Sequence, residues 1–179
     1  YTMVDEFVLC DAYYCSVMGS TWPNRFYLHL GTSQGEQGND WLSDQYSIFD
    51  ECTAKGVSCG YYYFGLTVPT TYSSPIDAPF MHMGETLFEH IESGDLPSVV
   101  YIDPTLSFFN VVGNCDHPPA DVRDGQAFVS TIYEALAQSE LWDRTLLVVT
   151  YDEHGGYYDH VSPPTVTDPF PGFEQLGFR

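Results

Sequence analysis

The sequence has 179 residues, of which 44% are hydrophobic, enough to bury the core of one globular domain. Five lysines and arginines stand against 25 aspartates and glutamates, which gives a formal net charge of −20. This charge argues against nucleic acid as a partner, because proteins bind phosphate backbones by neutralising them with cations. It also argues against electrostatic docking on anionic membranes.

The sequence gives little indication of a membrane span, a signal peptide or disulfide bonds. No run of about 18 apolar residues appears that could span a membrane. The opening stretch YTMVDEFVLC has neither the basic region nor the small-residue cleavage site of a signal peptide. Five cysteines cannot all pair within the chain and show no C-x-x-C spacing, so we expect buried free thiols. A bridge between Cys52 and Cys59, which would suit a secreted protein, is the alternative.

The first third of the chain predicts short elements. The apolar run that opens EFVLCDAYYCSV (residues 6–17) predicts a short strand, and MGSTWPNR (residues 18–25) reads as a loop broken by Gly19 and Pro23. Residues 31–40 are rich in turn-forming residues. A helix is expected within residues 44–56, ending at Gly56 in a left-handed cap.

The rest of the chain alternates strands with helices. Strands are predicted within residues 57–65, 96–104 and 144–152, and helices within 84–95 and 120–139. In the last helix Asp121 is the expected N-cap, and Val129, Ile132 and Leu136 form the expected inward stripe. Strands that are apolar on both faces and alternate with helices indicate an α/β fold, with a mostly parallel sheet covered on both sides.

A cluster of charge follows the last predicted strand. In such sheets ligands bind at the carboxyl ends of the strands, where YDEHGGYYDH (residues 151–160) begins. Asp152 and Glu153 can both reach one cation if the backbone turns there. Their oxygens suit Mg²⁺, Ca²⁺ or Mn²⁺, while His154 and His160 would admit Zn²⁺ or Fe. A metal would also supply the positive charge that this chain lacks for an anionic substrate. The alternative is a solvated acidic loop.

Three other positions could carry chemistry. Thr21 offers a hydroxyl nucleophile, although a threonine two residues before a proline is also an ordinary helix N-cap. His117, in CDHPPADVR, lies in the loop between the predicted strand at 99–103 and the long helix. It could donate to an anionic oxygen or protonate a leaving group, or be a surface histidine. Asp159 could fix the tautomer of His160 through a hydrogen bond.

Three stretches together resemble a known family. GSTWPNR, DHPPADVRDGQAFVSTIYEAL and TYDEHGGYYDHVSPP occur in the order found in the phosphoesterase family that contains bacterial and plant non-specific phospholipases C and related acid phosphatases. The resemblance implies an alkaline-phosphatase-like three-layer α/β/α fold and metal-assisted phosphoester hydrolysis. It also implies export to an extracellular or secretory compartment.

The resemblance assigns roles residue by residue. Thr21 becomes the nucleophile rather than an N-cap, Asp152 and Glu153 contribute to the metal centre, and His117 lies at the phosphate end of the pocket. The remaining motif residues are assigned to two roles. Asn24 and His154 are assigned to substrate binding. Asp159 and His160 are assigned to support of the metal ligands. The identity of the divalent metal is left open among Ca²⁺, Mg²⁺, Mn²⁺, Zn²⁺ and Fe.

The chain departs from the family pattern at both ends. Nothing resembles the family's Glu-Asn-Arg-Ser-Phe-Asp motif, whose Glu-Asn pair completes the metal site, and GFEQLGFR (residues 172–179) looks like the approach to a further strand. We therefore expect residues 1–179 to be an internal fragment of one phosphoesterase domain. Three functions stay open: phospholipase C, acid phosphatase on small monoesters, and a catalytically inactive relative that serves in binding. Aromatic residues at 61–64 and in LSFFNVV (residues 106–112) are candidates for an acyl-chain mouth, or core residues.

Overall fold

The computed structural model describes residues 2–65, 78–106, 113–167 and 177–178. Its contacts divide the chain into two compact units. One is formed by Tyr1–Asn39 together with Tyr151–Arg179, and the other by Asp40–Thr150. The expectation of one domain over residues 1–179 stays a prediction, and each unit is described by itself.

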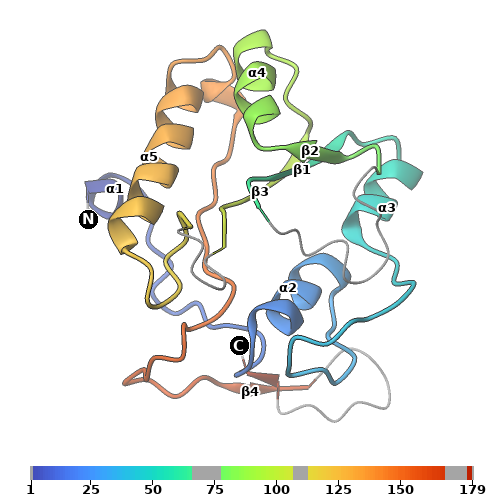
Figure 1. The fold of residues 1–179 in the computed structure, drawn as a ribbon, viewed down its shortest axis with the longest axis vertical. Helices are drawn as coiled ribbons and strands as arrows, with labels where there is room; N and C mark the ends of the chain where they lie inside the picture. Colours follow the sequence, from blue (N-terminus) through green and yellow to red (C-terminus); the bar gives the residue numbers. More distant parts are fainter. Residues whose placement is uncertain (1, 66–77, 107–112, 168–176, 179) are drawn as a thin grey trace. The chain divides into compact units, whose positions relative to one another are not determined.

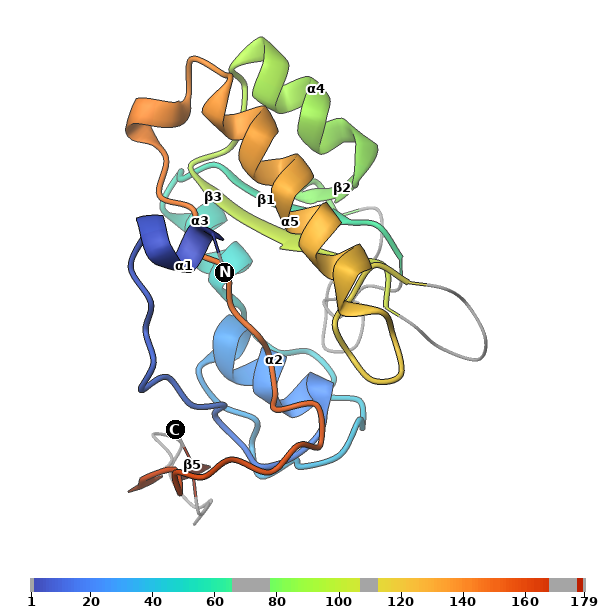
Figure 2. The same cartoon turned by 90° about the vertical axis from the view of Figure 1, so that its left-hand side faces the viewer.

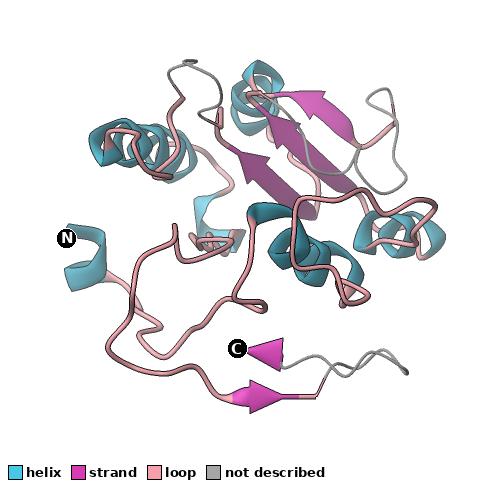
Figure 3. Cartoon of the chain, turned by 60° about the horizontal axis from the view of Figure 1, so that its bottom comes forward, coloured by secondary structure: helices cyan, strands magenta, loops and turns pink. Residues whose placement is uncertain are grey.

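A three-stranded parallel sheet organises the Asp40–Thr150 unit. The strands are β1 (Cys59–Tyr63), β2 (Met81–Met83) and β3 (Val99–Asp103), in the order β2-β1-β3. Figures 1 and 3 show them side by side, running in the same direction. The chain passes from β2 through helix α4 (Glu85–Ser93) to β3 on the other side of β1. Parallel neighbours require such crossovers, since a tight hairpin can join only antiparallel strands.

Successive tyrosines of β1 anchor the two faces of this sheet. Tyr61 and Tyr62 are both fully buried, and neighbours along a strand point to opposite faces. Tyr61 packs in a cluster with Met81 and with Phe49 of helix α3 (Ile48–Ala54). Its hydroxyl donates to the buried carboxylate of Asp103.

Tyr62 packs on the opposite face, beneath α4 and α5 (Val122–Ala137). These two helices lie side by side, as Figure 2 shows. Their buried contributions to the cluster are Leu87, Ile91, Ile132 and Leu136. Helices therefore cover both faces of a parallel sheet, which confirms the predicted α/β class and its three layers.

The helix boundaries in this unit follow local signals. A capping box joins Ser47 and Asp50 at the start of α3, and Gly56 follows that helix with the left-handed φ of 68° that its predicted role requires. Asp121 caps α5, as predicted, by accepting from the Arg123 backbone N–H at 3.0 Å. Of the predicted inward stripe Ile132 and Leu136 are buried, whereas Val129 is only half-buried.

The other unit carries short elements. They are α1 (Thr2–Glu6), α2 (Thr21–Leu30) and an antiparallel pair of two-residue strands, β4 (Thr165–Val166) and β5 (Gly177–Phe178). The predicted loop at residues 18–25 is therefore wrong from Thr21 onward, where α2 begins. Pro23 does not break this helix because the N–H groups of a first turn have no intrahelical acceptor to lose. The predicted strand after Glu6 is also wrong: no strand forms there, and Val8 is 91% exposed.

The strand predicted at residues 144–152 does not form. A short 3₁₀ helix (Trp142–Arg144) precedes a stretch without regular structure. Leu147 packs against the Tyr62 cluster, but Leu146 is 88% exposed. An apolar, β-branched run becomes a strand only when a neighbour pairs with its backbone, and no described strand pairs with this one.

All five cysteines are free thiols, including Cys52 and Cys59. No described helix is both long enough and apolar enough to cross a membrane.

Replacement of Leu87 by alanine tests the α4 side of the core. Leu87 is fully buried, so L87A should lower the free energy of unfolding by about 2–5 kcal/mol. The matched control is L146A, because Leu146 is 88% exposed and its truncation should cost less than about 0.5 kcal/mol. Urea unfolding of the 179-residue chain measures both, and equal costs would contradict the core described above.

Candidate active site

Helix α2 begins at the predicted nucleophile. Ser20 occupies the N-cap position without a side-chain capping bond, and the partly buried Thr21 is the first helical residue. Its hydroxyl therefore lies at the end of the helix where the peptide dipoles leave a partial positive charge. That charge favours an alkoxide or a phosphate oxygen there. One N–H group of this turn is already used, because Trp22 donates to Asn39 Oδ1 at 3.0 Å.

Asn24 fixes the segment that leads into α2. Its Oδ1 accepts from the Val17 N–H at 2.8 Å, and its Nδ2 donates to the Val17 and Ser20 carbonyls, both at 3.0 Å. The residue is only 4% exposed. The amide thus makes three hydrogen bonds to the backbone immediately before Thr21. Its assignment to substrate binding stays a prediction, but these contacts are those of a structural clamp.

One face of α2 carries a row of polar residues. Thr21, Arg25 and His29 follow one another at intervals of four, so they lie along the same side of the helix. Arg25 and His29 are both buried. Burial, with a smaller contribution from the Arg25 charge, lowers the pKa of His29 to about 3. His29 is therefore neutral near pH 7, and Arg25 carries the positive charge of this face.

Arg25 binds the first of the two predicted metal ligands. Its Nε donates to Asp152 Oδ2 at 2.8 Å, across 127 positions of sequence, and both residues belong to the same unit. The chain from residue 151 onward, orange in Figure 2, passes alongside α2. Asp152 Oδ1 accepts from the Glu153 backbone N–H at 3.0 Å. Because Thr21 lies one turn before Arg25, this ion pair brings the Asp152 carboxylate to the Thr21 face of the helix.

The second carboxylate is held by its own loop. The Glu153 side chain is 7% exposed, and its Oε2 accepts from the Gly155 N–H and lies 3.3 Å from His154 Nδ1. Gly155 and Gly156 take φ values of 65° and 76°, which glycine adopts without a steric penalty. The two glycines therefore turn the backbone back toward Glu153, and one imidazole nitrogen of His154 is engaged with this carboxylate.

Sequence reasoning missed Cys15 and Arg25. Burial raises the pKa of the Cys15 thiol, and the negative charges of Glu153 and Asp152 raise it further, so the thiol lies within reach of their field. No sequence pattern around either residue indicates its role. Cys15 is not spaced from another cysteine as metal ligands are, and Arg25 meets its partner Asp152 only in the folded chain.

The two carboxylates of this loop have the chemistry of metal ligands. Asp152 and Glu153 offer the hard oxygen ligands that Mg²⁺, Ca²⁺ and Mn²⁺ prefer. Within the described ranges, however, no group of three or more histidine, cysteine, aspartate or glutamate side chains is placed to hold a metal ion. By their chemistry the two carboxylates fit a cation as hard oxygen ligands, and a complete site would need further ligands beyond them.

The remaining predicted residues lie as follows. His117 is exposed in the loop between β3 and α5, in the Asp40–Thr150 unit, with Nδ1 2.7 Å from the Pro118 carbonyl oxygen. Asp159 accepts from the Val161 N–H at 2.9 Å, and His160 packs edge-on against Tyr158. Among the described contacts no hydrogen bond joins Asp159 to His160. The roles of these residues stay predictions.

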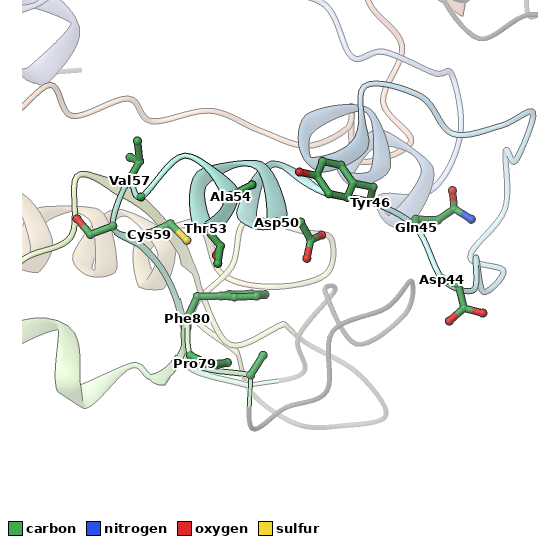
Figure 4. Close-up of a pocket in the computed structure, with 13 residues that line it drawn as sticks. Asp44, Gln45, Tyr46, Asp50, Thr53, Ala54, Val57, Cys59, Pro79 and Phe80 are labelled. Carbon is green, nitrogen blue, oxygen red and sulfur yellow. The ribbon is translucent and has the colours of Figure 1, made fainter.

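An open hollow of about 1140 Å³ lies elsewhere, beside α3 and the amino end of β1 (Figure 4). Its lining includes Tyr46, Phe80 and Cys59 but none of the predicted site residues. It lies at the wrong end of β1 for the carboxyl-edge site that parallel sheets provide. Residues 107–112, which include most of one candidate acyl-chain mouth, lie outside the described residues.

The family model for the phosphoesterase family matches residues 1–175. The chain belongs to the phosphoesterase family. It is 37% identical to "Non-specific phospholipase C3" and 36% identical to "Non-specific phospholipase C6", both of Arabidopsis thaliana, over 99% of this chain and 38% of each relative. A bacterial relative, "Non-hemolytic phospholipase C" of Burkholderia pseudomallei (strain K96243), is 27% identical over 92% of this chain and 29% of its own length. The chain thus spans well under half the length of these relatives.

Replacement of Asn24 distinguishes a structural clamp from a substrate ligand. N24A removes three hydrogen bonds, of which the two to Val17 are buried and the one to Ser20 is partly buried, so it should lower the free energy of unfolding by about 2–3 kcal/mol. Thermal and urea unfolding of N24A measure this. An unchanged stability would return Asn24 to the substrate-binding role.

The neutral state of His29 predicts a pH dependence of stability. In the unfolded chain this histidine takes up its proton near pH 6.5, whereas in the folded protein it does so only near pH 3. The contribution of neutral His29 to the free energy of unfolding is therefore complete above pH 6.5. It is lost as the pH falls toward 3, by up to about 1.4 kcal/mol per pH unit. H29Q should flatten this slope, whereas H117Q, at an exposed histidine, should not. Urea midpoints between pH 7 and pH 5 provide the measurement, and parallel slopes for the wild type and H29Q would contradict it.

Proposed function

We propose that the protein hydrolyses phosphoester bonds as a phospholipase C acting on glycerophospholipids, with Thr21 as the nucleophile. The observation that supports the proposal is the Arg25–Asp152 ion pair, which joins Asp152 of the Asp-Glu-His loop to the helix face that also carries Thr21. Membership of the family supports the reaction class, and the names of the phospholipase C relatives support the phospholipid substrate. Export from the cell remains part of this proposal.

In the proposed reaction Thr21 Oγ attacks phosphorus. A bond forms between Oγ and phosphorus as the hydroxyl proton leaves to solvent, and the bond from phosphorus to the glycerol oxygen breaks, which releases diacylglycerol and leaves the phosphorylated head group esterified to Thr21. The leaving glycerol oxygen takes up a proton as the bond breaks. Water then cleaves this ester, which releases the phosphorylated head group and restores the hydroxyl of Thr21. The positive end of α2 stabilises negative charge on Oγ and on the phosphoryl oxygens.

Asp152 and Glu153 are proposed to hold a divalent cation beside Thr21. When bound, such a cation would supply Lewis-acid polarisation of the phosphoryl group and would favour ionisation of a nearby hydroxyl. The charge balance of the chain supports this role. With five lysines and arginines in 179 residues, and Arg25 already bound to Asp152, the protein has few cations of its own for a phosphate.

Replacement of Thr21 tests the nucleophile. T21A should lose at least about a thousandfold in kcat on phosphatidylcholine because no other group forms the covalent intermediate. T21S keeps a hydroxyl and should retain measurable turnover. Acid quenching during turnover of phosphatidylcholine labelled in its phosphate should trap a phosphocholine ester of Thr21 in the wild type, the same ester of the introduced serine in T21S and no label in T21A.

Three outcomes would contradict parts of this proposal. Substantial turnover by T21A would exclude Thr21 as the nucleophile. A higher kcat/KM on p-nitrophenyl phosphate than on phosphatidylcholine would favour a phosphatase of small monoesters. Loss of both activities in the wild type would indicate an inactive relative.

A further inference from the structure

We propose that Arg25 is a positioning residue, whose guanidinium sets where the Asp152 carboxylate stands relative to Thr21. The inference rests on the proposed function and assigns a role to a residue that makes no proposed contact with substrate. It starts from the 2.8 Å contact between Arg25 Nε and Asp152 Oδ2.

The location of this ion pair favours a specific role over a surface contact. The Arg25 side chain is 10% exposed and the Asp152 side chain 24% exposed, so solvent screens the pair only in part. By comparison, Arg123 and Asp121 form an ion pair on the surface, with side chains that are 84% and 42% exposed. Exposed pairs contribute little to stability, whereas breaking a pair that is largely buried leaves an uncompensated charge. Arg25 is therefore held in one place by its surroundings.

The hydrogen bonds of Asp152 leave it able to bind a cation. Oδ2 accepts from Arg25 and Oδ1 accepts from the Glu153 N–H. An ionised carboxylate has about four lone-pair sites on its two oxygens. These two bonds thus fix the rotation of the carboxylate while each oxygen keeps acceptor capacity. This is the arrangement expected of a metal ligand that is oriented by groups behind it.

Arginine suits this task better than lysine. The Nε–H group of a guanidinium points in a direction fixed by the planar group, whereas a lysine ammonium is a flexible point charge. Arg25 also stands on a helix whose entry is fixed by Asn24, one turn after Thr21. A rigid donor on a rigid helix therefore sets the separation between nucleophile and carboxylate.

The sign of a change in metal affinity separates positioning from simple charge. If Arg25 acted only as a charge, its removal would strengthen binding of a cation, because one repelling positive charge would be lost. If Arg25 orients Asp152, its removal weakens binding, and loss of a group that orients a metal ligand typically weakens affinity by about 10–100-fold. The two roles thus predict opposite results.

The experiment measures Mn²⁺ binding to the purified protein by titration calorimetry, in the wild type and in R25Q, R25K, D152N and R123Q. R25Q should weaken Mn²⁺ binding by about 10–100-fold. R25K, which keeps the charge but not the planar donor, should also weaken it. D152N should abolish binding, and R123Q, at the exposed pair, should leave it unchanged. Far-UV circular dichroism and thermal midpoints identify any variant that fails to fold, and R25K provides the decisive comparison if R25Q does so.

Steady-state kinetics provide the second readout. R25Q and R25K should lower kcat on phosphatidylcholine by about 10–100-fold with little change in KM, and added methylguanidinium should restore part of the R25Q loss. Wild-type affinity for Mn²⁺ in R25K, or equal or tighter binding in R25Q, would overturn the role of Arg25 and leave the proposed function intact. A wild type that binds no Mn²⁺ would overturn the metal component of the proposed function, and the inference with it.

Discussion

The candidate site depends on one ion pair between distant parts of the chain. Arg25 and Asp152 are 127 residues apart, and the segments that carry them, Tyr1–Asn39 and Tyr151–Arg179, form a single unit. Folding of this unit must close a very long loop, at an entropic cost that grows only slowly with loop length. A charge-assisted hydrogen bond at 2.8 Å between partly buried groups fixes the register once the segments meet. The chemistry assigned to Thr21 and Asp152 depends on that register.

The two units use different kinds of interaction. Apolar packing organises the Asp40–Thr150 unit, in which Tyr61 and Tyr62 anchor opposite faces of the sheet. In the other unit α2 buries Phe26, and polar contacts join the helix to other segments: Asn24 binds the backbone that precedes the helix, and Arg25 binds Asp152. Polar interactions are directional, whereas apolar packing mainly rewards burial of area. Directional polar interactions are therefore better suited than apolar packing to a site that must hold a hydroxyl and a carboxylate in a defined geometry.

The sequence predicted the elements whose signals are local. Strands β1 and β3 and helices α4 and α5 were expected because their apolar periodicity and capping residues lie within the elements themselves, as Asp121 illustrates. Helix α2 was missed because Gly19 and Pro23 were interpreted as breakers, although a proline costs little in a first turn. The prediction of a strand at 144–152 was wrong because strand formation also depends on a pairing partner. The apolar pattern of a segment does not indicate whether such a partner exists.

The candidate site also contains residues that the sequence indicates locally and one that it does not. Thr21, Asp152 and Glu153 were proposed from motifs that resemble a family, and their common unit follows from the fold. Arg25 lay within a quoted motif, yet nothing local predicts that its partner is Asp152. Contacts across more than a hundred residues are fixed by the fold as a whole, so single-sequence reasoning could name the reactive groups but not the residue that orients one of them.

The stretch TLLVVT at residues 145–150 has a consequence for handling the protein. It contains no charge and no proline, consists of residues favoured in strands, and exposes Leu146, Val148 and Val149 to solvent. Short segments of this composition stack into intermolecular β-structure when they are left uncovered. Self-association through this stretch, rather than loss of the folded core, should therefore limit the concentration at which the isolated chain stays in solution.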